Sequence, residues 1–313
     1  MATNGTNSRK CPQCGTPGAS VEEMESHVAE SHLRRTTRLR RMLEDEGMVV
    51  APFCVNAFHA KIAQMVGFEA VYMTGFGTAA ERGYPDVGLL TQTEMVQNAK
   101  YIVGAVDVPV VCDADTGYAN PLNVWRTVRE YEAVGVAAIH LEDQVFPKKC
   151  GFFEGKQVVP LAEHTQKIRA ALDARQDKDM VIIARTDALA LNGWEDVVQR
   201  CHSYHDAGAD LVFVDGIRTA DDIGTYAAEL RELPRMYNGS LVAPSEVAKL
   251  GFKLMITVPT LPIVYGAVKE AFRILKEEDR QPRGMWDDRP EILAMLGLPG
   301  VYEMEKVYST DSR

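Results

Sequence analysis

Residues 110–118 read VVCDADTGY, and this stretch decides the fold that we expect for the chain. Its apolar beginning predicts a buried strand over residues 108–112, which leads directly into Asp113 and Asp115. Because side chains alternate between the two faces of a strand, both carboxylates should point to the same side at its C-terminal end. Two carboxylates this close repel each other unless a cation lies between them, and Mg²⁺ prefers such oxygen ligands. A strand-to-loop junction with two solvated acids is the alternative interpretation.

Two further apolar segments end in the same way. Residues 137–141 run into Glu142, and residues 181–184 run into Arg185. Successive strands that each end in charged residues are typical of a parallel (β/α)₈ barrel with its chemistry at the C-terminal rim. Converging acids and an arginine fit a metal-bound substrate that carries several negative charges. His140 lies inside one of these strands, and we interpret it as structural rather than catalytic.

The rest of the chain continues the alternation. Apolar runs predict strands over residues 49–51, 70–73, 211–214 and 254–257. Amphipathic segments predict helices over residues 57–66, 92–105, 120–134, 161–174, 194–207, 260–276 and 291–296. Residues 146–160 form a long connection, which suggests a mobile cover over the site.

Four motifs occur together: DADTGY at residues 113–118, HLEDQ at 140–144, KKCG at 148–151 and IARTD at 183–187. In this order they resemble the isocitrate lyase/phosphoenolpyruvate mutase superfamily, and within it the small lyases related to 2-methylisocitrate lyase. The resemblance extends from about residue 41 to the C-terminus. It implies a TIM barrel that uses Mg²⁺, or Mn²⁺ in its place, on 2-oxo or 2-hydroxy acids. It also implies a homodimer or homotetramer in which C-terminal helices are exchanged between subunits.

The resemblance assigns roles to individual residues. Asp113, Asp115 and Glu142 would hold the metal, Glu142 directly or through water. Arg185 would clamp a substrate carboxylate, while pairing with Asp187 is its alternative role. Cys150 would transfer a proton at the enolate carbon, and it favours carbon–carbon cleavage because mutases and hydrolases of the family lack it. With Glu142 and Arg185 it forms the expected catalytic set. Further substrate contacts are expected at Tyr72, Thr74, Gly75, Phe76, Asp86, Lys149, Gly151, Phe152, Asp215 and Asn238.

The sequence departs from the family pattern at three places. Phe152 stands where the lyases carry histidine, and Asp215 stands where glutamate is usual. The family's Asn-x-Thr-Glu substrate-binding sequence is not retained near residues 236–240, where Asn238 is the one residue that can match it. These changes predict a substrate with a less polar or smaller group beyond the cleaved bond. The alternatives are a decarboxylase or hydrolase of an oxaloacetate-like acid, a phosphonate P–C mutase or hydrolase, and a scaffold that has lost catalysis.

The N-terminal segment carries ligand residues with the spacing of a zinc finger. Cys11, Cys14, His27 and His32 form C-x₂-C-x₁₂-H-x₄-H, which predicts a structural Zn²⁺ site. Chance cysteines and histidines in a floppy tail are the alternative. We expect residues 1–33 to form tail and finger, and residues 34–313 the catalytic domain. The arginine-rich residues 34–41 should pair with acids of the barrel rather than bind nucleic acid.

Composition limits the remaining possibilities. The 313 residues carry a formal charge of −10, with a pI near 5.3, which argues against nucleic-acid binding by the whole surface. Six cysteines in a chain of this length do not indicate a disulfide framework. We find neither an apolar run long enough for a membrane span nor a signal core, and therefore expect a cytoplasmic enzyme.

Overall fold

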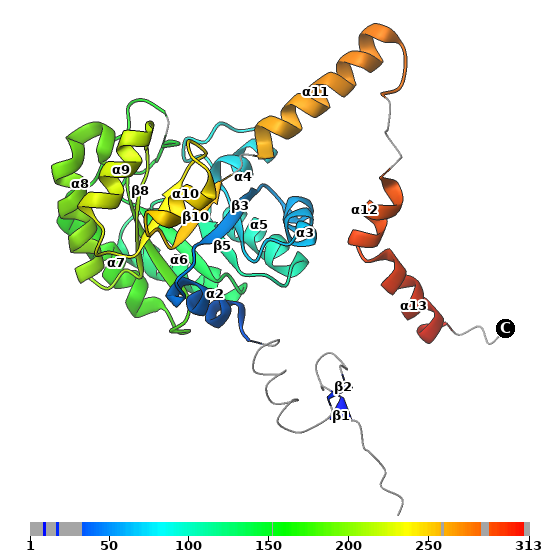
Figure 1. Cartoon of the computed structure of the whole chain (residues 1–313), viewed down its shortest axis with the longest axis horizontal. Helices are drawn as coiled ribbons and strands as arrows, with labels where there is room; N and C mark the ends of the chain where they lie inside the picture. Colours follow the sequence, from blue (N-terminus) through cyan, green and yellow to red (C-terminus); the bar gives the residue numbers. More distant parts are fainter. Residues whose placement is uncertain are drawn as a thin grey trace, which may run out of the picture.

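Eight parallel strands close into a barrel (Figure 1). Strand β10 pairs with β3, so the last strand of the barrel closes against the first. The strands are β3 (Val49–Cys54), β4 (Val71–Met73), β5 (Val110–Asp113), β6 (Ala138–Glu142), β7 (Val181–Thr186), β8 (Leu211–Val214), β9 (Arg235–Asn238) and β10 (Leu254–Thr257). This computed structural model describes residues 33–151, 153–257, 260–282 and 288–309, and the strands β1 (Arg9–Lys10) and β2 (Pro17–Gly18). The predicted barrel is confirmed.

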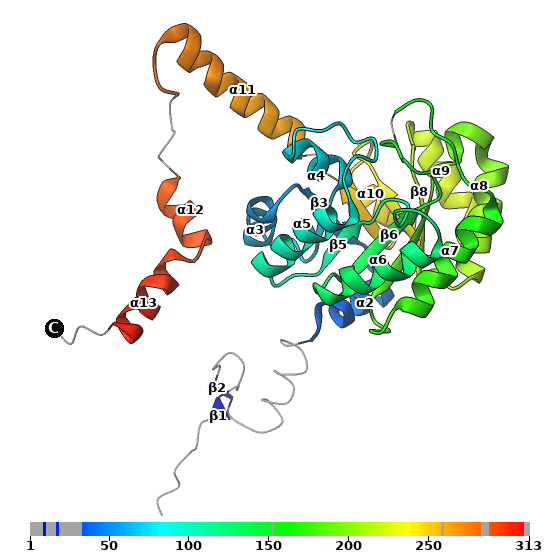
Figure 2. The ribbon, with the colours of Figure 1, turned by 180° about the vertical axis from the view of Figure 1, so that it is seen from behind.

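Helices surround the barrel on its outside (Figure 2). They are α3 (Ala57–Val66), α4 (Gly75–Glu81), α5 (Gln92–Ala105), α6 (Pro121–Ala133), α7 (Leu161–Ala174), α8 (Leu189–Asp206), α9 (Ala220–Glu229) and α10 (Pro244–Lys249). Local sequence sets several of their ends. The Asn120 side chain accepts hydrogen bonds from the first turn of α6, where Pro121 follows it. Gly67 ends α3 in the left-handed conformation, with φ 103°.

Two local expectations are corrected. Strand β5 begins at Val110 rather than at residue 108, and it includes Asp113. The sequence TGFG at residues 74–77, with its two glycines, indicates a turn, but its last three residues are the first part of helix α4. It becomes helical because Thr74 caps it, with its hydroxyl accepting a hydrogen bond from the Gly77 amide at 3.4 Å.

Helix α2 (Arg35–Glu44) closes the N-terminal end of the barrel. Its side chains Leu39 and Leu43 pack in one buried cluster with Val49, Ala137 and Val181, which lie at the starts of barrel strands. The predicted pairing of the arginine-rich segment with barrel acids is confirmed, since four of its ion pairs join Arg34 or Arg40 to Asp177, Asp179 or Asp210. Partly exposed pairs of this kind add little stability, so the buried leucines contribute most of the contact.

Three helices follow the barrel; the first extends away from it, and the second lies in contact with α3 (Figures 1 and 2). They are α11 (Thr260–Glu278), α12 (Arg289–Met295) and α13 (Leu298–Tyr308), and none of them contains a buried residue. The sequence predicted the first two and missed α13. Exchange of these helices between subunits stays a prediction.

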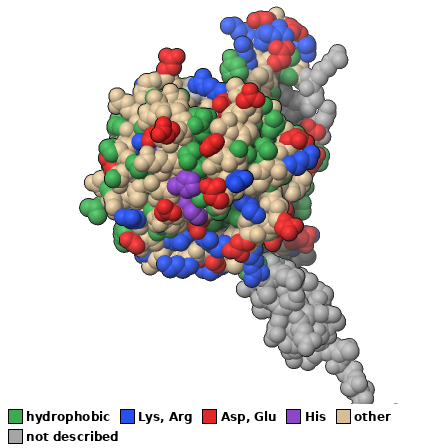
Figure 3. Space-filling view, turned by 60° about the vertical axis from the view of Figure 1, so that its left-hand side comes forward, with side chains coloured by type: hydrophobic (Ala, Val, Ile, Leu, Met, Phe, Trp, Pro, Cys, Tyr) green, Lys and Arg blue, Asp and Glu red, His purple; other side chains and the backbone are tan. Residues whose placement is uncertain are grey.

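The N-terminal zinc hypothesis falls on Cys11, Cys14, His27 and His32, which lie outside the described residues. Strands β1 and β2, which flank the two cysteines in sequence, pair antiparallel, with Arg9 opposite Gly18. In the part of the chain that the structure describes, no helix is long and apolar enough to cross a bilayer. On the face drawn in Figure 3, acidic and basic side chains are interspersed rather than gathered by sign.

Shortening the Leu39 side chain tests whether α2 stabilises the N-terminal end of the barrel. Leu39 is fully buried, so Leu39→Ala should lower the free energy of unfolding by roughly 2–5 kcal/mol through lost burial and a residual cavity. Urea denaturation followed by circular dichroism measures the change. Leu122→Ala is the matched control, because Leu122 is 80% exposed on α6 and should shift the same measurement by less than about 0.5 kcal/mol. Equal effects at the two positions would contradict the assignment of α2 as a plug.

Candidate active site

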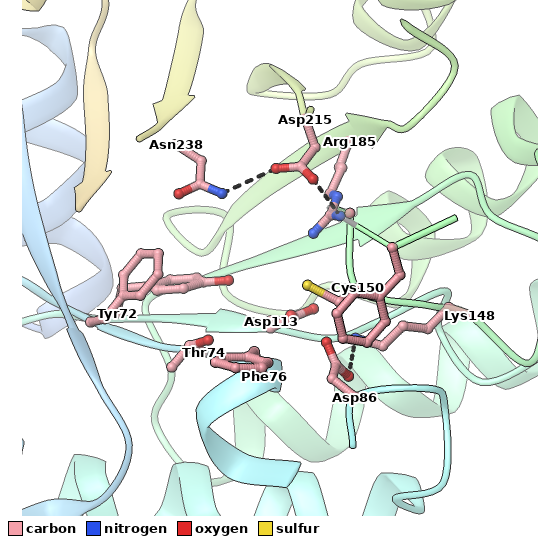
Figure 4. Close-up of a pocket in the computed structure, with 13 residues that line it drawn as sticks. Tyr72, Thr74, Phe76, Asp86, Asp113, Lys148, Cys150, Arg185, Asp215 and Asn238 are labelled. Atoms are coloured by element: carbon pink, nitrogen blue, oxygen red, sulfur yellow. Dashed lines mark hydrogen bonds and ion pairs between the residues drawn. The ribbon is translucent and has the colours of Figure 1, made fainter. Parts of the chain in front are cut away.

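A cavity of about 280 Å³ opens at the C-terminal ends of the barrel strands (Figure 4). This is the rim at which the strand-end residues were expected to meet. Most residues predicted for the site line it: Tyr72, Thr74, Phe76, Asp86, Asp113, Cys150, Gly151, Arg185, Asp215 and Asn238. Phe53, Lys148 and Phe153 also line it and were not predicted as contacts.

Asp113 and Asp115 are both buried at the mouth of the barrel. The reason differs from the expected strand alternation, because β5 ends at Asp113 and Asp115 has a left-handed backbone, with φ 49°. Aspartate tolerates this conformation better than most residues. The Asp115 amide donates to Asp113 Oδ1 at 2.9 Å, and the Gly75 amide donates to Asp113 Oδ2 at 3.2 Å. A side chain at Gly75 would meet that carboxylate, so a glycine is required there.

Lys148 supplies a positive charge inside this acidic cluster. Its ammonium lies 2.7 Å from Asp86 Oδ1 and 2.9 Å from Asp115 Oδ1, and the side chain is almost completely buried. Burial raises the pKa of Asp115 to about 6 even though Lys148 opposes the rise. Burial also acts against ionisation of Asp113, but His140, Lys148 and Arg185 together outweigh it and lower the pKa of Asp113 to about 2. The same cluster therefore shifts the pKa values of the two acids in opposite directions.

Glu142 lies fully buried beside Arg185 at the end of β6. Its Oε2 is 3.2 Å from Arg185 Nη1, and Oε1 has no hydrogen-bond partner among the described residues. Burial raises the pKa of Glu142 well above its ordinary value, although the Arg185 charge opposes this. Its carboxyl group is therefore harder to ionise than that of an exposed glutamate, and a further cation would make ionisation easier.

Arg185 is held by carboxylates on three sides. Its Nε donates to Asp187 at 2.8 Å, and its Nη2 donates to Asp215 at 3.0 Å. The Asn238 amide donates to the other oxygen of Asp215 at 3.1 Å (Figure 4). The alternative role of Arg185, pairing with Asp187, is thus present, and the same pairing fixes the guanidinium where it lines the cavity.

Tyr72 and His140 form a buried pair behind the cavity. The Tyr72 hydroxyl lies 2.8 Å from His140 Nε2. Burial lowers the pKa of His140 to about 4 and raises the pKa of Tyr72 well above 10, so both groups are neutral near pH 7. His140 is completely buried within β6, as its structural interpretation requires, and it also orients a hydroxyl that lines the cavity.

Cys150 enters the cavity from the long segment between β6 and α7. Its amide donates to the Asp86 carbonyl at 2.9 Å, and its sulfur points toward the centre of the site (Figure 4). Lys149 next to it does not line the cavity, because its ammonium donates to the Glu154 carbonyl at 3.2 Å on the exposed side. Phe152 lies outside the described residues.

Residues 39–276 match the family model described as phosphoenolpyruvate phosphomutase. The chain belongs to this family. It is 40% identical over 289 residues to 2,3-dimethylmalate lyase of Eubacterium barkeri, a match that covers 89% of this chain and 99% of the relative. A 2-methylisocitrate lyase of Aeropyrum pernix is 36% identical over 275 residues, covering 86% and 88%. The superfamily resemblance seen in the sequence is confirmed, and the chain is an enzyme of that superfamily.

Solved structures of the superfamily agree with the fold. Oxaloacetate acetylhydrolase in complex with 3,3-difluorooxalacetate superposes with a TM-score of 0.83 at 32% identity, covering 90% of this chain and 99% of the other. Phosphonopyruvate hydrolase in complex with oxalate and Mg²⁺ superposes with a TM-score of 0.81 at 28% identity, covering 88% and 99%. A family member therefore binds Mg²⁺ together with a small dicarboxylate.

The donor set of this phosphomutase-family chain fits a hard divalent cation. Asp86, Asp113, Asp115 and Glu142 offer oxygen ligands of the kind that Mg²⁺ prefers, and Glu142 has an unpartnered oxygen. Among the described residues no three acids, histidines or cysteines already surround a common point, because the Lys148 ammonium lies between Asp86 and Asp115. A cation bound at Asp86 or Asp115 would share these carboxylates with Lys148.

A second layer of polar contacts supports the end of β7. Asp143 accepts hydrogen bonds from Thr186, Arg200 and Tyr204 at 2.7, 3.1 and 2.9 Å. Its other oxygen accepts from the Asp187 amide at 2.9 Å, which fixes the turn that follows Arg185. The sequence showed Asp143 inside a motif but gave no sign of this role, because its partners come from distant helices.

Some of the lining residues that the sequence analysis missed could have been predicted, and others could not. Phe53 lies near the C-terminal end of β3, so the same rim argument that found Asp113 would have found it. Phe153 and Lys148 belong to the long segment after β6, where no periodicity relates sequence position to direction. Their contacts follow only from how that segment folds back over the rim.

His164, a buried histidine on α7, predicts that the free energy of unfolding depends on pH. Burial, reinforced by the charges of Lys167 and Arg200, lowers the pKa of His164 to about 3 from its ordinary 6.5. Between pH 6.5 and 3 the unfolded chain therefore binds a proton at this histidine and the folded chain does not. The contribution of neutral His164 to the free energy of unfolding is fully present above pH 6.5, and the free energy falls as the pH drops from there toward 3. His164→Gln should reduce the slope of unfolding free energy against pH by about 1 kcal/mol per unit near pH 5.

Urea titrations of this variant and the wild type between about pH 7 and pH 4.5 measure the difference. His202→Gln is the control, because the His202 side chain is 42% exposed on α8 and its loss should leave the slope unchanged. A wild-type slope retained in His164→Gln would contradict the assignment.

Proposed function

We propose that this protein is a Mg²⁺-dependent lyase that cleaves a carbon–carbon bond of a 2-hydroxy di- or tricarboxylate and releases a 2-oxo acid. The observation that carries the proposal is the Cys150 thiol, which lines the same cavity as Asp113 and Arg185. A proton donor beside an acidic metal-ligand set and a carboxylate clamp is what cleavage through an enolate needs. Mn²⁺ is an alternative metal on the same oxygen ligands.

The residues of the site have separate roles in this reaction. Arg185 and the amides at the start of α4, around Gly75 and Phe76, hold substrate carboxylates. The Tyr72 hydroxyl, oriented by His140, contacts the substrate oxygen. The 2-hydroxyl gives its proton to a carboxylate of the cavity and becomes the carbonyl of the 2-oxo acid. The electron pair of the broken carbon–carbon bond stays on the departing carbon, and Cys150 donates a proton there. A cation held by Asp113, Asp115 and Glu142, with Asp86 beside them, would stabilise the negative charge on the 2-oxygen.

The lining of the cavity favours an alkyl-substituted dicarboxylate, of the dimethylmalate kind, over a tricarboxylate. The rings of Phe53, Phe76 and Phe153 line it, and these surfaces suit alkyl groups. Arg185 and Lys148 are the cationic residues among those that line it, and both are already paired with carboxylates. A third substrate carboxylate would therefore find no unpaired lysine or arginine in the described lining. The name of the relative from Eubacterium barkeri agrees with this choice.

Two other functions are weaker. The likeness to oxaloacetate acetylhydrolase and phosphonopyruvate hydrolase supports hydrolysis of an oxaloacetate-like acid or P–C chemistry as the alternative. A scaffold without catalysis would have no need for six buried acids and a buried arginine around one cavity, since burying charge is costly. The predicted zinc finger would then serve a partner, and it does not bear on the barrel.

A substrate panel tests the lyase. The enzyme is incubated with 2,3-dimethylmalate, 2-methylisocitrate, oxaloacetate and phosphonopyruvate, with Mg²⁺ or with EDTA, and products are identified by mass spectrometry. We expect Mg²⁺-dependent cleavage of 2,3-dimethylmalate, and a loss of at least about 100-fold in kcat for Cys150→Ser, since proton transfer contributes that much. Calorimetric Mg²⁺ binding should persist in the variant. Turnover of oxaloacetate or phosphonopyruvate with no cleavage of 2,3-dimethylmalate or 2-methylisocitrate, or an active Cys150→Ser, would contradict the proposal.

We also propose that the protein assembles into a dimer or tetramer through its C-terminal helices, and that it works in the cytoplasm. Apolar side chains on α11 and α13 are exposed and need a covering surface: Ile263, Val264, Val268, Phe272, Leu275, Val301, Tyr302, Met304 and Val307. The cytoplasmic part of the proposal follows the sequence, whose six cysteines do not indicate a disulfide framework.

Light scattering after size exclusion tests the assembly. The wild type should exceed the 34.6 kDa of one chain by a factor of two or four. Phe272→Asp should shift it toward the mass of one chain, because Phe272 is 68% exposed in the single chain and a buried charge is costly at an interface. Lys276→Ala on the same helix is the control and should leave the mass unchanged. A monomeric wild type would contradict the proposal.

A further inference from the structure

We propose that Lys156 is a positioning residue that holds the segment carrying Cys150 closed over the cavity. The inference deepens the proposed function, because it gives Lys156 the task of placing the thiol that this function uses as proton donor. Lys156 belongs to none of the motifs that carry the family resemblance, and it does not line the cavity.

The contacts of Lys156 join the segment to the catalytic rim. Its ammonium donates to the Gly151 carbonyl at 2.6 Å and to Asp187 Oδ1 at 2.9 Å. The residue is 7% exposed, and lysine is rarely buried to this extent unless it is paired. Asp187 in turn binds Arg185 at 2.8 Å. One ammonium thus connects the residue after Cys150 with the aspartate that holds the carboxylate clamp.

The segment fits tightly where Lys156 holds it. A Cβ added at Gly151 would overlap the Asp215 carboxylate and lie 2.9 Å from Arg185 Nη2. The backbone beside Cys150 therefore lies directly against the floor of the cavity, and a glycine is needed for the approach. Any opening of the segment moves the thiol away from the cavity centre.

The other anchors of the segment cannot replace Lys156. Gln144 binds the backbone of Lys149 on the other side of Cys150, at 2.8 and 3.0 Å. Lys148 binds Asp86 and Asp115, but these carboxylates belong to the set that fits a divalent cation, so Lys148 and the metal compete for them. Asp187 lies outside that set. The Lys156 contact is therefore compatible with a loaded metal site, and it fixes the side of Cys150 that Gln144 leaves free.

The accessibility of the Cys150 thiol tests this directly and needs no turnover. The enzyme is saturated with Mg²⁺ and oxalate and treated with iodoacetamide, and alkylation of the Cys150 peptide is followed by mass spectrometry. Lys156→Met should alkylate at least tenfold faster than wild type, because the segment opens more often once both charged hydrogen bonds of the ammonium are lost. Lys156→Arg, which keeps the charge and donors, should restore most of the protection.

Gln157→Met is the matched control, since Gln157 is the next residue and is exposed. It should alkylate at the wild-type rate. Once a substrate that the enzyme cleaves has been identified, Lys156→Met should lower kcat about 100-fold and change KM less. A loss of about this size is expected when a reacting group is displaced by about an ångström. Alkylation of Lys156→Met at the wild-type rate would overturn the proposal, as would equal acceleration in Lys156→Met, Lys156→Arg and Gln157→Met. Failure of the lyase assay alone would overturn the proposed function and leave the alkylation result to decide the role of Lys156.

Discussion

The balance of charge at the mouth of the barrel is the constraint on which the rest of the site depends. Six carboxylates are buried there: Asp86, Asp113, Asp115, Glu142, Asp187 and Asp215. In the described part of the chain, the lysine and arginine side chains that contact them are Lys148, Lys156 and Arg185. Burying an unpaired charge costs several kcal/mol, so this excess must be relieved by protonation or by a further cation. The raised pKa of Glu142 favours its protonation, which removes one negative charge, and a bound divalent ion would neutralise others.

This balance also limits what the cavity can bind. Arg185 touches three acids, so its net attraction for a substrate carboxylate is smaller than that of a free guanidinium. What it offers is geometry, because its position is fixed by bidentate contact with Asp187. The opposite wall of the cavity is aromatic. A small acid with apolar substituents matches both surfaces better than a heavily charged one, which agrees with the loss of family polar residues seen in the sequence.

Much of the fold and part of the site could be predicted from the sequence. Apolar runs predicted seven of the eight barrel strands and missed β9, a short strand that begins with a charged residue and ends with a polar one. The rim rule then brought Asp113, Glu142 and Arg185 together without knowledge of the contacts. The conformation of Asp115 could not be predicted, because a left-handed aspartate leaves no periodic pattern. Helix α13 was missed because its apolar residues face no partner within the described chain. Lys148 and Lys156 were missed because their direction depends on a segment with no regular structure.

These two lysines show how one segment can be both held and released. Lys148 is bound to acids that a cation would take over, so its attachment weakens as the site is loaded. Lys156 is bound to an acid whose other partner is an arginine that stays in place, so its attachment does not depend on the metal. Lys156, Gln144 and the hydrogen bond from the Cys150 amide to the Asp86 carbonyl hold the thiol over the cavity, and none of these three contacts uses the carboxylates to which Lys148 is bound.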